Sequence, residues 1–206
     1  MKVNIKLGLL VFITSCATID TNKIAPGYVE AFISIKQIIL GYEDNIKPEM
    51  INNIPYASML VKIGRGPTAL MILEKINDDE YTWVSADGVY LVIKNGRIIK
   101  TFGLSNNLQE KLTSFKNWKR SSIHTKDFIS YYSFNKPELN NLKVISSFHF
   151  QEIEKVELIF GTKNLGLIEE NIESDEIGWS VTNKYWIDRD DYVWKSVQYV
   201  SPRLPA

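Results

Sequence analysis

The sequence predicts a mainly β protein, an antiparallel meander forming a barrel-like or sandwich domain, with one N-terminal amphipathic helix. From Ile54 onward, short apolar runs alternate with turn residues, as in strands joined by tight hairpins. Two of these turns, Asp87-Gly88 and Asn95-Gly96, tolerate positive φ at both positions and are typical of two-residue hairpin loops. Strands and helices do not alternate along the sequence, which argues against a parallel βαβ sheet.

Residues 1–15 are predicted to form a secretory signal peptide. Two lysines precede the apolar run LGLLVFI, which is too short to span a bilayer as a helix, and the small pair Thr14-Ser15 follows. The single cysteine of the chain, Cys16, comes next, so that ITSC resembles a bacterial lipobox. In such signals the chain is cut before the cysteine, whose sulfur then carries diacylglycerol. We therefore predict lipid attachment at Cys16, with an ordinary signal peptide and an incidental cysteine as the alternative.

The segment that follows the signal is predicted to be a tether and then a helix. Residues 16–25 are polar and without an apolar pattern, as in a short tether. Apolar side chains then recur at helical spacing, at Tyr28, Phe32, Ile35 and Ile39. Pro26 suits the start of a helix and Gly41 its C-terminal cap. We expect this helix to pack on the body of a single β-rich domain, residues 26–206.

The remaining elements are expected strands. They are separated by turn dipeptides, and residues 105–127 are polar and predicted to form a short helix with a loop. The expected strands cover residues 57–63, 68–76, 81–85, 89–93, 98–102, 143–150, 155–160, 165–172, 179–188 and 192–200.

A candidate binding surface follows from the two tight turns. If both loops have two residues, Trp83 faces Val92, and Val92 faces Ile99 on the next strand. Side chains alternate across a strand, so one face of these three strands is nearly all apolar and belongs to the core. The other face mixes rings, hydroxyls and cations on a partly accessible surface. Its candidate ligand-binding residues are Tyr81, Trp83, Tyr90 and Arg97.

Composition argues against several classes of function. The chain has 24 basic and 24 acidic residues, and without the two signal-peptide lysines 22 basic residues remain, so nucleic acid is not an expected partner. His124 and His149 fit no metal-ligand spacing, and a G-x-S-x-G elbow is missing from the sequence. The acidic turn at Asp188 and Asp190-Asp191 lacks the EF-hand spacing and is expected to be solvated. We therefore predict no catalytic residue, no metal site and no cofactor.

Several motifs resemble the YjbF/GfcB outer-membrane lipoproteins, which accompany group-four capsule and exopolysaccharide gene clusters in Gram-negative bacteria. The motifs are IPYASMLVKIG (54–64), WVSADG (83–88), NGRIIKTFGL (95–104), NKYWID and VWKSVQYVSP. The resemblance runs from the signal peptide to Pro202 and is weakest over 105–150. At the final turn the family often has threonine-glycine where this chain has Asp190-Asp191.

The resemblance implies a β-rich, barrel-like domain that helps polysaccharide secretion or assembly at the outer membrane and has no catalytic residues. Ala17 follows the cysteine where an inner-membrane retention signal would place aspartate, which agrees with the outer membrane.

Three functions remain open. The first is a non-enzymatic accessory lipoprotein of capsule or exopolysaccharide export, held at the outer membrane by lipid on Cys16 and facing the periplasm. It would bind glycan or a protein of the export machinery. The second is a carrier of lipid or lipoprotein acyl chains in a barrel cavity. The third is a periplasmic hydrolase, which a cluster of acids in a cleft would indicate.

Overall fold

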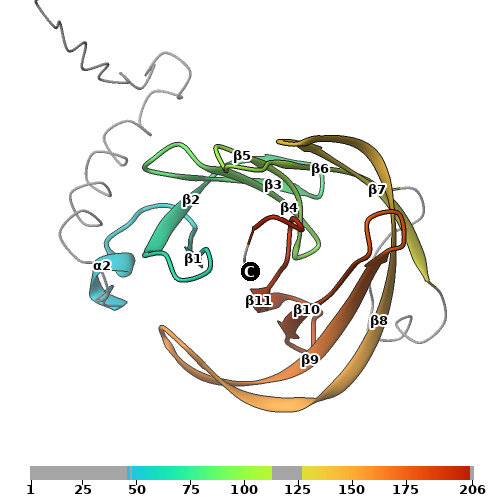
Figure 1. Ribbon diagram of the computed structural model, residues 1–206. Helices are drawn as coiled ribbons and strands as arrows, with labels where there is room; N and C mark the ends of the chain where they lie inside the picture. The colour runs from blue at the N-terminus through green and yellow to red at the C-terminus, as the bar shows by residue number, and fades with distance from the viewer. Residues whose placement is uncertain (1–45, 47, 113–126, 205–206) are drawn as a thin grey trace, which may run out of the picture.

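The described residues form one antiparallel sheet that curls into a half-barrel (Figure 1). In this computed structural model they are residues 46, 48–112 and 127–204. Eleven strands of this part of the chain follow the order β1 to β11, each paired with its neighbours in sequence. The prediction of a mainly β antiparallel meander is therefore confirmed. Cys16, the tether and the predicted helix over 26–41 lie outside the described residues.

The described elements are one short helix and the eleven strands. They are α2 (Pro48–Asn52), β1 (Ser58–Lys62), β2 (Thr68–Asn77), β3 (Glu80–Ser85), β4 (Tyr90–Lys94), β5 (Arg97–Phe102), β6 (Leu108–Leu112), β7 (Phe128–Asn135), β8 (Glu138–Leu158), β9 (Gly161–Ser174), β10 (Trp179–Ile187) and β11 (Val193–Val197).

The middle of the chain differs from the sequence-based expectation. β6 lies within the stretch predicted to be helix and loop, and β7 follows where no strand was expected. The central residue of β6, Glu110, points inward and carries a carboxylate. The sequence LQEKL therefore does not show the alternation of apolar and polar residues that is typical of a strand. β8 joins two strands that were expected to be separate, with an irregularity in the pairing between Phe150 and Ile153.

The Asn95-Gly96 turn has the predicted form. Both residues have positive φ, 50° and 79°, and Lys94 pairs with Arg97 across a two-residue loop. Farther along this hairpin a bulge places Val92 opposite Lys100, so the expected pairing of Val92 with Ile99 is wrong.

The Asp87-Gly88 turn is one residue longer than predicted. Trp83 pairs with Leu91 instead of Val92. The backbone N–H of Ser85 donates to the carbonyl of Val89 at 2.9 Å, which leaves three residues in the loop. The Ser85 hydroxyl accepts a hydrogen bond from the Val89 N–H at 3.0 Å and stabilises this longer loop. Because side chains alternate, a shift of one residue moves every side chain of β4 to the other face relative to β3.

This shift puts Tyr90 and Trp83, which were expected to share a face, on opposite faces of the sheet. Tyr90 lies opposite Val84 and packs, partly buried, against the cluster formed by Leu70, Ile72 and Val84. Apolar side chains from and just after α2, among them Ile51 and Ile54, pack on the same cluster. Tyr90 is therefore on the face covered by this N-terminal segment, away from Trp83.

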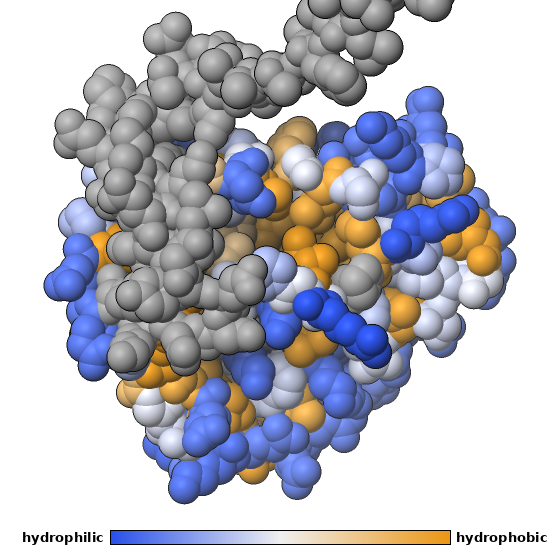
Figure 2. Space-filling model, turned by 60° about the vertical axis from the view of Figure 1, so that its left-hand side comes forward, coloured by the Kyte–Doolittle hydropathy of each residue, from blue (hydrophilic) through white to orange (hydrophobic). Residues whose placement is uncertain are grey.

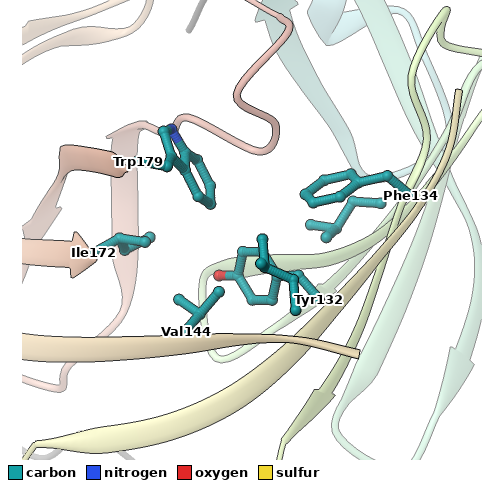
Figure 3. Packing of buried hydrophobic residues seen from close by; sticks show 7 residues of the cluster. Tyr132, Phe134, Val144, Ile172 and Trp179 are labelled. Carbon is teal, nitrogen blue, oxygen red and sulfur yellow. The ribbon is translucent and has the colours of Figure 1, made fainter. Parts of the chain in front are cut away.

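The largest apolar cluster lies inside the curl (Figure 3). Its buried residues are Leu108, Tyr132, Phe134, Leu142, Val144, Ile172 and Trp179, from strands β6 to β10. The ring of Tyr132 contacts that of Trp179, with 6.1 Å between their centroids. The cluster thus joins strands that are not neighbours in the sheet.

The C-terminal segment after β11 runs back toward the centre of the curl (Figure 1). Tyr199 and Val200 pack against the apolar cluster. The Gln198 amide accepts a hydrogen bond from the Ile98 N–H and donates one to the Gly96 carbonyl, both at 2.9 Å. The segment therefore ties the edge of the sheet at β11 to the β4–β5 hairpin.

The sheet remains open at the side of α2 and β1. Viewed from there, apolar side chains gather in the middle of the described surface and hydrophilic ones surround them (Figure 2). Exposed apolar side chains of the first hairpin include Leu60, Ile63 and Ile76. No helix within the described ranges is long and apolar enough to cross a bilayer.

Candidate functional site

The four candidate ligand-binding residues do not form one accessible face. Tyr81 is 39% exposed, Trp83 is half-buried, and both side chains belong to β3. Tyr90 is half-buried on the opposite face, and Arg97 is only 3% exposed inside the curl. The expectation that Arg97 lies on an accessible surface is therefore wrong, because its guanidinium has partners in the interior. Binding of a ligand by these residues stays a prediction.

Arg97 is the centre of a buried ionic cluster. Its Nη2 lies 2.9 Å from Glu170 Oε1 and 3.1 Å from Glu110 Oε1, and it donates to the hydroxyl of Tyr132 at 3.2 Å. Both carboxylate side chains have no exposed surface. β5 and β9 are four positions apart in the sheet, so only the curl brings Arg97 against Glu170.

Hydrogen bonds from β10 complete the surroundings of Glu170. Its Oε2 accepts from the Tyr185 hydroxyl at 2.7 Å and from Asn183 Nδ2 at 3.0 Å. The Asn183 carbonyl oxygen in turn accepts from the backbone N–H of Tyr199 at 2.7 Å. The cluster is thus connected to the C-terminal segment that lies inside the curl.

The cluster contains one guanidinium and two carboxylates. Burial alone would lower the pKa of Arg97, but the charges of Glu170 and Glu110 raise it well above its ordinary value, so the guanidinium stays charged. Burial raises the pKa of Glu110 above its usual value, and the nearby Arg97 only partly opposes this. Burial also raises the pKa values of Tyr132 and Tyr185 well above the usual range, which keeps both phenols neutral.

Full burial decides what this cluster can do. A general acid or base must reach the substrate within hydrogen-bond distance. The side chains of Glu110 and Glu170 have no exposed surface, so this pair of acids forms a polar core and lines no open cleft. Nor do any three metal-binding side chains gather into a possible metal site within the described residues.

Glu110 and Glu170 were not among the candidate residues predicted from the sequence. A signal was present for Glu170, since alternation in the strand LGLIEENI places it on the same face as Ile168 and Ile172. An acid between two isoleucines on a core face needs a buried partner. Only the curvature of the sheet shows that this partner is Arg97.

Comparisons with known proteins agree with the fold. A family model described as "Group 4 capsule polysaccharide lipoprotein gfcB, YjbF" matches residues 31–206. The chain is 24% identical over 163 residues to the uncharacterized lipoprotein YjbF of Escherichia coli (strain K12), covering 73% of this chain and 72% of that protein. It is also 24% identical over 147 residues to the uncharacterized lipoprotein GfcB of the same organism, with 69% of each chain covered.

A solved structure has the same architecture. The crystal structure of the hypothetical lipoprotein YmcC from Escherichia coli (K12) superposes with a TM-score of 0.65 at 19% sequence identity. The superposition covers 84% of this chain and 88% of that chain. At this level of identity the likeness concerns the fold.

Proposed function

Because this chain belongs to the YjbF family of group 4 capsule polysaccharide lipoproteins, we propose that it acts in the secretion or assembly of a capsule or exopolysaccharide. Its role is that of an accessory factor that performs no catalysis and binds glycan or a protein of the export machinery. The single observation that carries the proposal is the family match over residues 31–206, which includes all of the described sheet.

The proposal includes attachment to the outer membrane through lipid on Cys16, with the domain facing the periplasm. The lipobox-like ITSC and Ala17 support it. Burial of an acyl chain contributes about 0.8 kcal/mol per methylene group, and two or three chains make a lasting anchor where one does not.

The interior favours this role over that of an acyl-chain carrier. An acyl chain needs an apolar lining, because it cannot form hydrogen bonds with buried polar groups. The centre of the curl instead contains the ionic cluster of Arg97, Glu110 and Glu170, together with the C-terminal segment. We therefore place the functional contacts on the outer surface of the domain.

Gene deletion with complementation tests the proposal. Deletion should lower the amount of polysaccharide at the cell surface or in the medium, measured by uronic-acid and total-carbohydrate assays of washed cells and supernatant. A wild-type copy should restore it, whereas a Cys16→Ala copy made at the same level should restore little. Unchanged polysaccharide after deletion, in a strain that produces capsule, would contradict the proposal.

A further inference from the structure

Two large rings are exposed where β10 turns into β11. Tyr192 is 61% exposed and Trp194 is 42% exposed. The rings meet edge to face, with centroids 5.2 Å apart and planes at 70°. Among the described strands β11 is one edge of the sheet. Rings that remain in water beside each other are candidates for binding, since their apolar surface is buried only when a partner arrives.

The carboxylate of Asp188 holds the Trp194 ring and the backbone of Tyr192 in place. Its Oδ2 accepts from the indole N–H of Trp194 at 2.8 Å, and its Oδ1 accepts from the backbone N–H groups of Tyr192 at 3.0 Å and Asp190 at 2.9 Å. Partial burial would raise the pKa of Asp188, but the hydrogen bonds from Trp194, Tyr192 and Asp190 lower it. A turn fixed in this way presents the rings in one arrangement, so less conformational entropy is lost on binding.

A second indole extends the surface across the neighbouring strands. Trp186 of β10 is half-buried and donates its Nε1–H to Glu154 of β8 at 2.8 Å. Lys195, its partner in the register, places Nζ 5.1 Å from the centre of the Trp186 ring. Lys163 of β9 likewise places its Nζ 4.0 Å from the centre of the Trp194 ring.

These residues form a stripe of rings and charges across β8 to β11, which we call the aromatic platform. It consists of Trp186, Tyr192 and Trp194 with Lys163 and Lys195, supported by Glu154 and Asp188. Both indole N–H groups are satisfied by carboxylates, so the platform offers ring surface, ammonium groups and a phenol hydroxyl to a ligand.

We propose that the aromatic platform is a binding site for a polysaccharide chain. A sugar ring has apolar C–H faces that match aromatic rings, and its rim of hydroxyls and carboxylates accepts hydrogen bonds from ammonium groups. An aliphatic partner could not form hydrogen bonds with the charged groups that alternate with these rings. The identification of the ligand rests on the proposed function, which supplies a polysaccharide as the substance handled.

Binding to immobilised polysaccharide tests the site. The lipidated mature protein, in mild detergent, is passed over extracellular polysaccharide purified from the strain that carries the gene, and the dissociation constant is measured. The variants are Trp194→Ala, Tyr192→Ala and Trp194→Phe, which keeps a ring. Tyr81→Ala is the matched control, since it removes an exposed ring from β3, the face first suggested by the sequence. A melting curve of each variant checks folding.

We expect wild-type protein to bind and Trp194→Ala and Tyr192→Ala to bind about tenfold more weakly or worse, as for a ring at the centre of a contact. Tyr81→Ala should bind nearly as wild type, and Trp194→Phe, which keeps a ring but loses the N–H donated to Asp188, should bind with an affinity between those of wild type and Trp194→Ala. Should Trp194→Ala not fold, Tyr192→Ala decides the question. Equal affinity of wild type and the folded ring-removal variants, or a loss confined to Tyr81→Ala, would overturn the assignment.

The two proposals fail separately. If deletion of the gene lowers capsule but the protein does not bind the polysaccharide, the aromatic platform is not a glycan site and the proposed function stands. If the protein binds through Trp194 but deletion leaves capsule unchanged, the site stands and the proposed function fails.

Discussion

Replacement of Arg97 by methionine should destabilise the protein strongly. Methionine fills part of the same volume but leaves Glu170 and Glu110 buried without their guanidinium. Loss of one partner from a buried ion pair typically costs about 3–5 kcal/mol, because the remaining charge has no compensation. Since folded domains are stable by only about 5–15 kcal/mol, this is a large fraction of the total.

The contacts predict an order among the variants. Three contacts of Arg97, with Glu110, Glu170 and Tyr132, use Nη2, so the single ammonium of Arg97→Lys can replace part of them and should cost less stability than Arg97→Met. Glu110→Gln should be nearly neutral, since it leaves one guanidinium with one carboxylate. In the Glu110→Gln background, Arg97→Met should lower the free energy of unfolding by less than it does in the wild-type protein. The difference between the two losses, the coupling energy, should be at least about 0.5 kcal/mol.

Solution pH adds an independent test of Glu110. Its pKa is raised in the folded state, so its contribution to stability is fully present below the unfolded pKa and is lost as pH rises through the folded value. Glutamine has no such dependence. The stability of Glu110→Gln relative to wild type should therefore improve as pH rises above about 4.5.

Urea unfolding followed by tryptophan fluorescence measures each free energy, and melting curves give a second readout. For a domain of this size, about 3–5 kcal/mol corresponds to a fall in Tm of about 6–20 °C. If Arg97→Met changes the unfolding free energy by less than about 1 kcal/mol, below the range for a buried pair, Arg97 does not neutralise buried carboxylates. Equal costs of Glu110→Gln and Arg97→Met would contradict the predicted order as well.

Three further predictions concern the turns and the anchor. Gly96→Ala should lower Tm more than Gly88→Ala. Both glycines have positive φ, but of the two only Gly96 would place an added Cβ against Val193 Cγ2, so equal falls in Tm would contradict this contact. Millimolar calcium or EDTA should leave Tm unchanged, because the Asp188 carboxylate already accepts three hydrogen bonds; a rise of several degrees with calcium would reveal a bound ion. Cys16→Ala, exported with an ordinary cleavable signal, should fractionate as a soluble folded domain, and its retention on carbonate-washed membranes would show a second means of attachment.

Local patterns in the sequence were sufficient to predict most of the strands. Alternation and turn dipeptides located β1 to β5 and β9 to β11, because these strands expose one face or end at Gly and Asn positions. β6 was missed since its inward residue is charged. The Asp87-Gly88 loop was assigned one residue too short, because a glycine with positive φ fits a three-residue loop as well as a two-residue one.

The one extra residue in the Asp87-Gly88 loop explains the wrong placement of Tyr90 in the candidate site. The faces of β3 and β4 depend on the loop length, so Tyr90 was placed with Trp83 although the two lie on opposite faces. The partners of Arg97 depend on how far the whole sheet curls, which no local pattern records. The aromatic platform was hidden for a different reason: Trp194 was recognisable as a strand residue, but its exposure became clear only with the position of β11 at the edge of the described sheet.

The difference between Arg97 and Trp194 determines how export experiments on this domain should be interpreted. A loss of about 3–5 kcal/mol at Arg97 leaves less folded protein in the cell, so reduced export by such a variant would follow from abundance alone. Trp194 is 42% exposed whereas Arg97 is 3% exposed, so truncation of the Trp194 ring should cost less stability and leave abundance nearer to that of wild type. Reduced export at equal protein level in Trp194→Ala would therefore locate the function on the aromatic platform. Reduced export in Arg97→Met would show only that the folded core is required.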